Sequence, residues 1–157
     1  MKAVKLTQLK NELEHYSQKE LIEICLKLAK HKIENKELLT YLLLESQDED
    51  EFISGMKEEM DAEFSKLNHQ STYIIKKSTR KILRNLKKHI RFSKNKQTEA
   101  TLLIYFCLKL QEIMSKNMRS QQLINMFELQ LTLAKKAIST LHEDLQYDFN
   151  EDLEMLG

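Results

Sequence analysis

The chain has 157 residues, the length of one ordinary domain, and its 25 basic and 24 acidic residues nearly cancel. Proline is absent and glycine occurs only twice. Because the tight turns of β-hairpins rely on glycine, this composition excludes a sheet built from many hairpins. It predicts an all-α fold in one domain spanning residues 1–157, since no proline is present to interrupt the helices.

No apolar stretch approaches the roughly 18 residues that a membrane-spanning helix needs. The longest uninterrupted apolar run, Leu102 to Leu108, has seven residues. The segment from Met1 to Leu13 is charged throughout and lacks the apolar core of a signal peptide. These observations predict a cytoplasmic protein without a membrane span.

Helical periodicity begins close to the start of the chain. Apolar residues recur every three or four positions from Leu6 to Tyr16, which predicts a short amphipathic helix. Ser17 and Glu20 then form a capping-box pattern, in which each side chain bonds the backbone N–H of the other residue. A second helix is therefore predicted to run from this box to about His31.

A third helix is predicted from Lys36 to about Ser46, with Asn35 as its N-cap. Apolar residues cover much of its circumference; they are Leu38, Leu39, Tyr41, Leu42, Leu43 and Leu44. A helix that is apolar around most of its surface is normally buried. We therefore expect the third helix to be central in the domain.

A fourth helix follows the acidic turn Gln47–Glu51, and its apolar side extends from Phe52 to Leu67. Gly55 lies inside this helix, where it costs about 1 kcal/mol of helix propensity relative to alanine. The glycine marks either the close approach of a neighbouring helix or a weak point, and the sequence leaves both interpretations open.

The fifth helix is basic and runs from the polar break Asn68–Ser71 to about Phe92. Its apolar residues share an arc of about 100°, and its basic residues fill an adjoining arc of about 140°. The apolar arc contains Ile75, Thr79, Ile82, Leu83, Leu86 and Ile90. The basic face consists of Lys76, Lys77, Arg80, Lys81, Arg84, Lys87, Lys88 and Arg91. We expect this face to be an exposed stripe of positive charge.

Two further helices complete the predicted fold. Thr98 is predicted to cap the sixth helix, which is the most apolar segment, and Ser120 to cap a seventh that reaches Leu145. Residues 146–157 form an acidic tail, for which disorder is left open. The whole chain thus predicts about seven helices in antiparallel hairpins, arranged as a bundle or a short superhelical stack.

The methionine content offers two interpretations. Flexible methionine side chains either fill gaps in a core or line a deformable groove for a partner helix. Gap filling in a helical core is the expectation for Met56, Met60, Met114, Met118, Met126 and Met155.

Residue patterns for catalysis, metals and cofactors are weak. The five histidines are scattered, and Glu12–His15 is the one segment with the Glu-x-x-His spacing of di-iron bundles. Cys25 and Cys107 stand in apolar runs without an adjacent base, so both are expected to be buried and unreactive. No glycine-rich phosphate loop is present. We therefore predict no metal, no cofactor and no catalytic residues, and an enzyme is disfavoured.

The basic face has several possible uses. Acidic residues of the fourth helix, from Glu58 to Glu63, or the acidic tail would neutralise it internally if they paired with it. Nucleic-acid phosphates would bind it through arginine forks, with Tyr73 and Phe92 stacking on bases at its two ends. Aromatic residues are not interleaved with the cations, however, and the net charge is only +1.

The hypothesis that we carry forward is a non-catalytic interaction or scaffold protein. It presents the basic face to an acidic protein surface, or to another copy of the chain. The observation behind it is the window from Asn68 to Thr98, which contains ten cations and no acidic residue. The alternative is a nucleic-acid-binding module that uses Lys76–Arg91.

Overall fold

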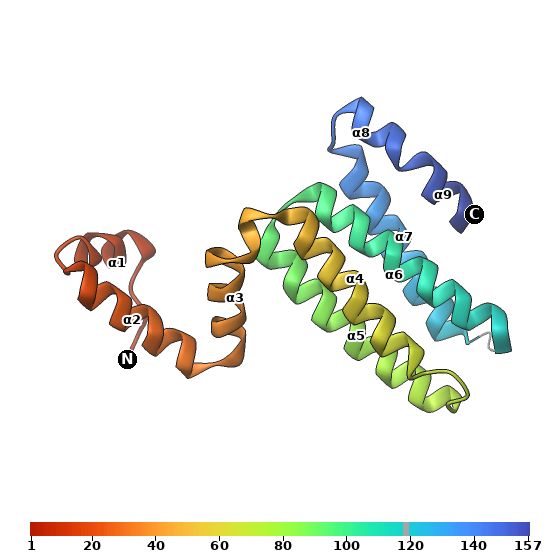
Figure 1. Cartoon of the computed structure of the whole chain (residues 1–157), viewed down its shortest axis with the longest axis horizontal. Helices are drawn as coiled ribbons and strands as arrows, with labels where there is room; N and C mark the ends of the chain where they lie inside the picture. Colours follow the sequence, from red (N-terminus) through yellow and green to blue (C-terminus); the bar gives the residue numbers. More distant parts are fainter. Residues whose placement is uncertain (118–119) are drawn as a thin grey trace. The chain divides into compact units, whose positions relative to one another are not determined.

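The computed structural model describes residues 1–117 and 120–157, which fold into nine α-helices and one 3-10 helix without any strand. The predicted all-α fold is confirmed. The described helices divide between two compact units, Met1–Leu43 and Leu44–Gly157. Both units are seen in Figure 1.

The first unit contains α1 (Leu6–Leu13), α2 (Gln18–His31) and α3 (Ile33–Leu43). The predicted capping box begins α2. The backbone N–H of Ser17 donates to Glu20 Oε2 at 2.8 Å, and the N–H of Glu20 donates to Ser17 Oγ at 3.2 Å. Helices α2 and α3 pack on each other.

The predicted cap of the third helix is wrong, because α3 begins two residues before Asn35. Lys32 has an extended backbone (φ −143°) that ends α2, and its carbonyl accepts from the N–H of Asn35 at 3.1 Å. The Asn35 side chain instead donates to the carbonyl of Leu28 at 2.8 Å. Asn35 therefore satisfies one of the last carbonyls of α2, which have no partner within their own helix.

The expectation that the third helix is central is also wrong. Tyr41 is the one buried residue of α3, whereas Leu42 and Leu43 are more than half exposed. The physical reason is the size of the unit, since 43 residues supply too few helices to surround an apolar helix on all sides.

The second unit is organised around one central helix, α6. Buried side chains occur along most of α6, and α4, α5, α7 and α9 all pack on it (Figure 1). The elements of this unit are η1 (Glu45–Gln47), α4 (Glu49–Ser65), α5 (Thr72–Ser93), α6 (Lys96–Asn117), α7 (Gln121–Ser139), α8 (Glu143–Asp148) and α9 (Asn150–Leu156). The most apolar segment of the sequence has thus become the centre of the core.

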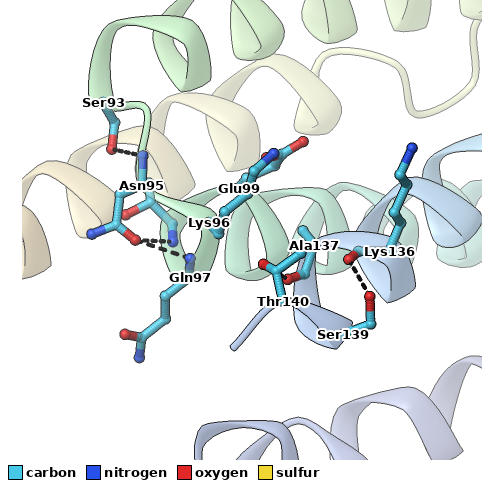
Figure 2. Close-up of polar contacts among 10 residues, drawn as sticks. Ser93, Asn95, Lys96, Gln97, Glu99, Lys136, Ala137, Ser139 and Thr140 are labelled. Atoms are coloured by element: carbon cyan, nitrogen blue, oxygen red, sulfur yellow. Dashed lines mark hydrogen bonds and ion pairs between the residues drawn. The ribbon is translucent and has the colours of Figure 1, made fainter. Parts of the chain in front are cut away.

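Asn95, and not the predicted Thr98, caps α6. The side-chain oxygen of Asn95 accepts from the backbone N–H groups of Gln97 at 2.9 Å and Thr98 at 3.2 Å (Figure 2). Thr98 is buried within the first turn, where its hydroxyl donates to the carboxylate of Glu49 on α4 at 2.7 Å. This bond ties the start of α6 to the start of α4.

The seventh helix is shorter than predicted, because α7 ends at Ser139 and Leu145 belongs to α8. The hydroxyls of Ser139 and Thr140 donate to the carbonyls of Lys136 and Ala137, both at 2.7 Å (Figure 2). Such side-chain bonds compete with the helical backbone pattern, and here they accompany its end.

The acidic tail forms the end of α8 and all of α9. Phe149 and Leu156 are buried, and α9 packs on α6. Met56 and Met60 are buried in the same unit, as expected for gap-filling residues, whereas Met155 is 65% exposed. Met118 lies outside the described residues.

The central position of α6 makes a prediction about stability. Phe106 is fully buried, and its ring centroid lies 5.7 Å from that of Phe64 on α4. We expect Phe106→Ala to lower the free energy of unfolding by about 3–5 kcal/mol through lost burial and a new cavity. Urea denaturation followed by circular dichroism measures this. Leu129→Ala, at a position 55% exposed on α7, is the control and should cost at most about 0.5 kcal/mol.

Gly55 allows a second prediction. No heavy atom lies within 4 Å of the position that a Cβ would occupy, which excludes close helix approach as the reason for this glycine. Gly55→Ala should therefore raise the free energy of unfolding by about 0.5–1 kcal/mol through helix propensity. The reciprocal change at an exposed position of α4, Ala62→Gly, should lower it by a similar amount. A loss of stability in Gly55→Ala would contradict the open space seen here.

Candidate binding surface on helix α5

Helix α5 holds its basic face outward because its opposite side is buried. Ser71 caps the helix by accepting from the N–H of Ile74, and Lys94 ends it in the left-handed conformation (φ 54°). The buried residues recur at helical spacing and are Ile75, Thr79, Ile82, Leu86 and Ile90. Because this arc packs against α4 and α6, the adjoining arc of cations faces solvent.

The eight predicted basic residues all lie on this outward side of α5. Five of them are exposed: Lys77, Arg80, Lys81, Arg84 and Arg91. The other three, Lys76, Lys87 and Lys88, are half-buried. Lys88 and Arg91 already interact within the chain, so the available positive charge rests on the remaining six.

The described acidic residues of α4 form no ion pair with these six cations, although Glu59 and Glu63 share a hollow with Lys81. Asp61 accepts from the hydroxyl of Tyr105 at 2.7 Å and forms an ion pair with Lys109 at 2.9 Å, both on α6. Glu63 pairs with Lys66, close to it along the chain. Of these two acids of α4, Asp61 therefore pairs with a residue of α6, and Glu63 pairs with a residue three positions further along the chain.

The pKa of Asp61 reflects this engagement. Partial desolvation opposes its ionisation, but the hydrogen bonds from Lys109 and Tyr105 outweigh desolvation and lower its pKa. Burial and the same carboxylate raise the pKa of Tyr105, and the bond to Asp61 raises that of Lys109. Asp61 is thus held as an anion that orients α4 against α6, away from the basic face.

Among the described residues, no carboxylate oxygen lies within 4.0 Å of a side-chain nitrogen of the six remaining cations. Those six are Lys76, Lys77, Arg80, Lys81, Arg84 and Lys87. In the described part of the chain, the face therefore keeps its charge available for an external anion.

Four of these cations line a shallow hollow of about 460 Å³ together with one apolar residue. The lining residues are Lys77, Arg80, Leu83, Arg84 and Lys87. Desolvation lowers the pKa of Lys87, Glu99 opposes that effect, and Arg91 adds to it. The hollow thus combines concentrated positive charge with a half-exposed leucine in its lining.

Sequence reasoning missed two contributors to this surface. Leu83 was placed in the apolar arc, yet it is only half-buried and lines the hollow. Gln122 of α7 accepts from Arg80 Nη2 at 3.0 Å and fixes that guanidinium. The position of Leu83 at the border of the apolar and basic arcs could have indicated its partial exposure. Nothing in the sequence, however, indicates the contact between Arg80 and Gln122, which are 42 positions apart.

The two aromatic residues at the ends of the face differ. Tyr73 is 71% exposed, but Phe92 is 8% exposed and its ring meets that of His89 edge-on at 5.4 Å. His89 in turn lies 6.5 Å from Phe52 on α4. Base stacking by Phe92 is therefore excluded, because its ring is buried within this cluster.

Potential catalytic groups are dispersed. Within the described residues, no three histidine, cysteine, aspartate or glutamate side chains gather in a metal-binding arrangement. Burial raises the pKa of the Cys107 thiol to about 12. Cys25 is exposed, so its predicted burial is wrong; its apolar neighbours belong to a unit too small to enclose it.

The two thiols should react very differently. In the folded protein at pH 8, we expect a disulfide reagent to modify one thiol per chain, Cys25, because Cys107 is buried and protonated. In urea both should react. Cys25→Ser is the control and should abolish the rapid reaction with the reagent in the folded protein. Modification of two thiols per folded chain would contradict the burial of Cys107.

Comparisons of the chain with known protein families, with curated proteins and with solved structures found no match. Within residues 1–117 and 120–157, no helix combines the length and the apolar character that crossing a bilayer requires.

Proposed function

We propose that this chain is a non-catalytic interaction protein that binds an acidic segment of a protein partner through the basic face of α5. The supporting observation is the set of six cations on α5 whose side-chain nitrogens have no carboxylate oxygen within 4.0 Å among the described residues. Four of them surround a hollow that contains Leu83.

The geometry of the hollow defines the chemistry of the partner. Its cations span Lys77 to Lys87 along one side of the helix, a length of about 15 Å at 1.5 Å per residue. A segment with several carboxylates over this length and one apolar side chain for Leu83 matches the surface. Exposed ion pairs contribute only about 0–1 kcal/mol each, so binding should be moderate in affinity and should weaken as salt rises.

Nucleic acid fits this surface less well. Proteins that bind single strands stack bases on aromatic side chains, and burial of Phe92 leaves Tyr73 as the one exposed aromatic at the ends of the face. The net charge of +1 also supplies little overall attraction for a long phosphate backbone. An acidic protein segment requires neither stacking nor an overall positive charge.

Charge reversal tests the proposal. The probe is a fluorescent peptide in which glutamates spaced four residues apart flank a single leucine, and anisotropy measures its binding. Arg80→Glu with Arg84→Glu should weaken binding at least about tenfold, because like charges then face the peptide. The matched control, Lys135→Glu with Lys136→Glu on exposed positions of α7, makes the same change in net charge and should have little effect.

Two outcomes would overturn the proposal. One is equal binding of a peptide with glutamine in place of every glutamate, since recognition would then not depend on charge. The other is salt-sensitive binding of mixed DNA or RNA that is lost in the Arg80→Glu, Arg84→Glu variant while the acidic peptide fails to bind. That result would assign the face to nucleic acid.

A further inference from the structure

The first unit, Met1–Leu43, exposes far more apolar surface than the second. Among the described residues, 12 of the 18 exposed large hydrophobic residues lie in this unit, although it has little more than a quarter of the chain. Tyr41 is the one large hydrophobic residue of the unit that is buried. The unit therefore lacks a core of its own.

Helix α1 shows this most clearly. Leu6, Leu9 and Leu13 recur at three- and four-residue spacing and so share one face, yet they are 83%, 45% and 40% exposed. No residue of α1 is buried, and the helix scarcely touches any other described helix. An eight-residue amphipathic helix gains little stability by itself in water, so its apolar face calls for a partner.

Helix α2 continues the apolar surface. Leu21 and Ile24 are half-buried, while Ile22 and Leu26 form a second stripe that is 52% and 50% exposed. The exposed Cys25 lies between the two stripes on the helical wheel. The apolar arc of α2 is thus wider than one neighbouring helix covers.

Small units of this kind need an additional source of stability. Chains near 40 residues usually require disulfides, metals or oligomerisation. Both cysteines here are free thiols, and no metal-binding cluster occurs among the described residues. Contact of the exposed apolar face with another apolar surface is therefore the remaining source of stability.

A second copy of the same unit matches this surface best. The exposed large hydrophobic residues described in Leu44–Gly157 are fewer and scattered: Leu44, Tyr73, Ile74, Leu129, Tyr147 and Met155. A two-fold axis instead places each apolar face against an identical one. The unit has eight lysines and six glutamates, a mixture that avoids repulsion between copies.

The charges of α2 also suit self-association. Glu23 and Lys30 both flank the stripe formed by Ile22 and Leu26 on the helical wheel. An antiparallel pair of α2 helices centred near Leu26 brings Glu23 of each copy close to Lys30 of the other. Antiparallel packing also aligns the helix dipoles favourably.

We infer that two copies of the chain associate through the exposed apolar face of α1 and α2. This contact is independent of the basic face on α5. If a different protein or another part of the same chain covered this apolar face instead, the isolated protein would be a monomer. The oligomeric state therefore distinguishes self-association from these alternatives.

Sedimentation of the full chain tests the inference. The expected mass is twice 18.7 kDa at micromolar concentration. Ile22→Glu with Leu26→Glu should yield a monomer of unchanged helical content, since these side chains are exposed in the single copy. The matched control, Leu129→Glu, changes an equally exposed leucine of α7 and should leave the dimer intact. Arg80→Glu with Arg84→Glu should likewise leave it intact.

Cross-linking supplies a second readout that does not depend on the folding of a variant. Cys25 is the accessible thiol on the proposed interface, so a short bismaleimide should join two copies of the wild-type chain, and Cys25→Ser should prevent this. A wild-type monomer at about 100 μM, or a dimer that survives both glutamate substitutions, would overturn the inference. If the wild-type chain were still monomeric at about 100 μM, the dissociation constant of the dimer would be far weaker than that of a stable interface.

Discussion

Burial of α6 is the constraint on which the second unit depends. Four helices cover this apolar helix, and each must turn one face inward to do so. For α5 the inward face is the row from Ile75 to Ile90, which leaves no orientation for its cations except outward. The basic face is therefore a consequence of core packing, and any change that rotated α5 about its axis would also expose apolar residues.

Polar contacts around α6 reinforce this arrangement. Asp61 reaches Tyr105 and Lys109, and Glu49 accepts from Thr98 at the start of α6. Both carboxylates belong to α4, the acidic neighbour of the basic helix. Asp61 is held by α6, and Glu49 is held by Thr98 of α6 together with Ser93 at the end of α5; neither forms an ion pair with Arg80 or Arg84. The fold thus separates charges that lie close together in the sequence, and this separation keeps the face available.

Local signals predicted much of this structure, and contacts between distant residues account for the rest. The capping box at Ser17 and the two arcs of α5 involve neighbours within one or two turns, so spacing alone indicates them. The end of α7 near Thr140 and the cap at Asn95 depend on competing side-chain bonds that periodicity does not register. Phe92 contacts His89 of its own helix, and His89 in turn contacts Phe52 of α4, a link between helices that no local pattern indicates.

The errors in the first unit have a different cause. Apolar content indicates that a surface will be covered but does not say what covers it, so Cys25 and the leucines of α3 were assigned to a core that this unit lacks. The proposed self-association through the first unit and the proposed binding by the basic face would then support each other. A pair of chains joined through α1 and α2 would carry two copies of the basic face, and an acidic partner with two suitable segments would engage both. The second contact would then form at an effective concentration set by the pair and not by bulk solution, so weak, salt-screened ion pairs would suffice for firm binding.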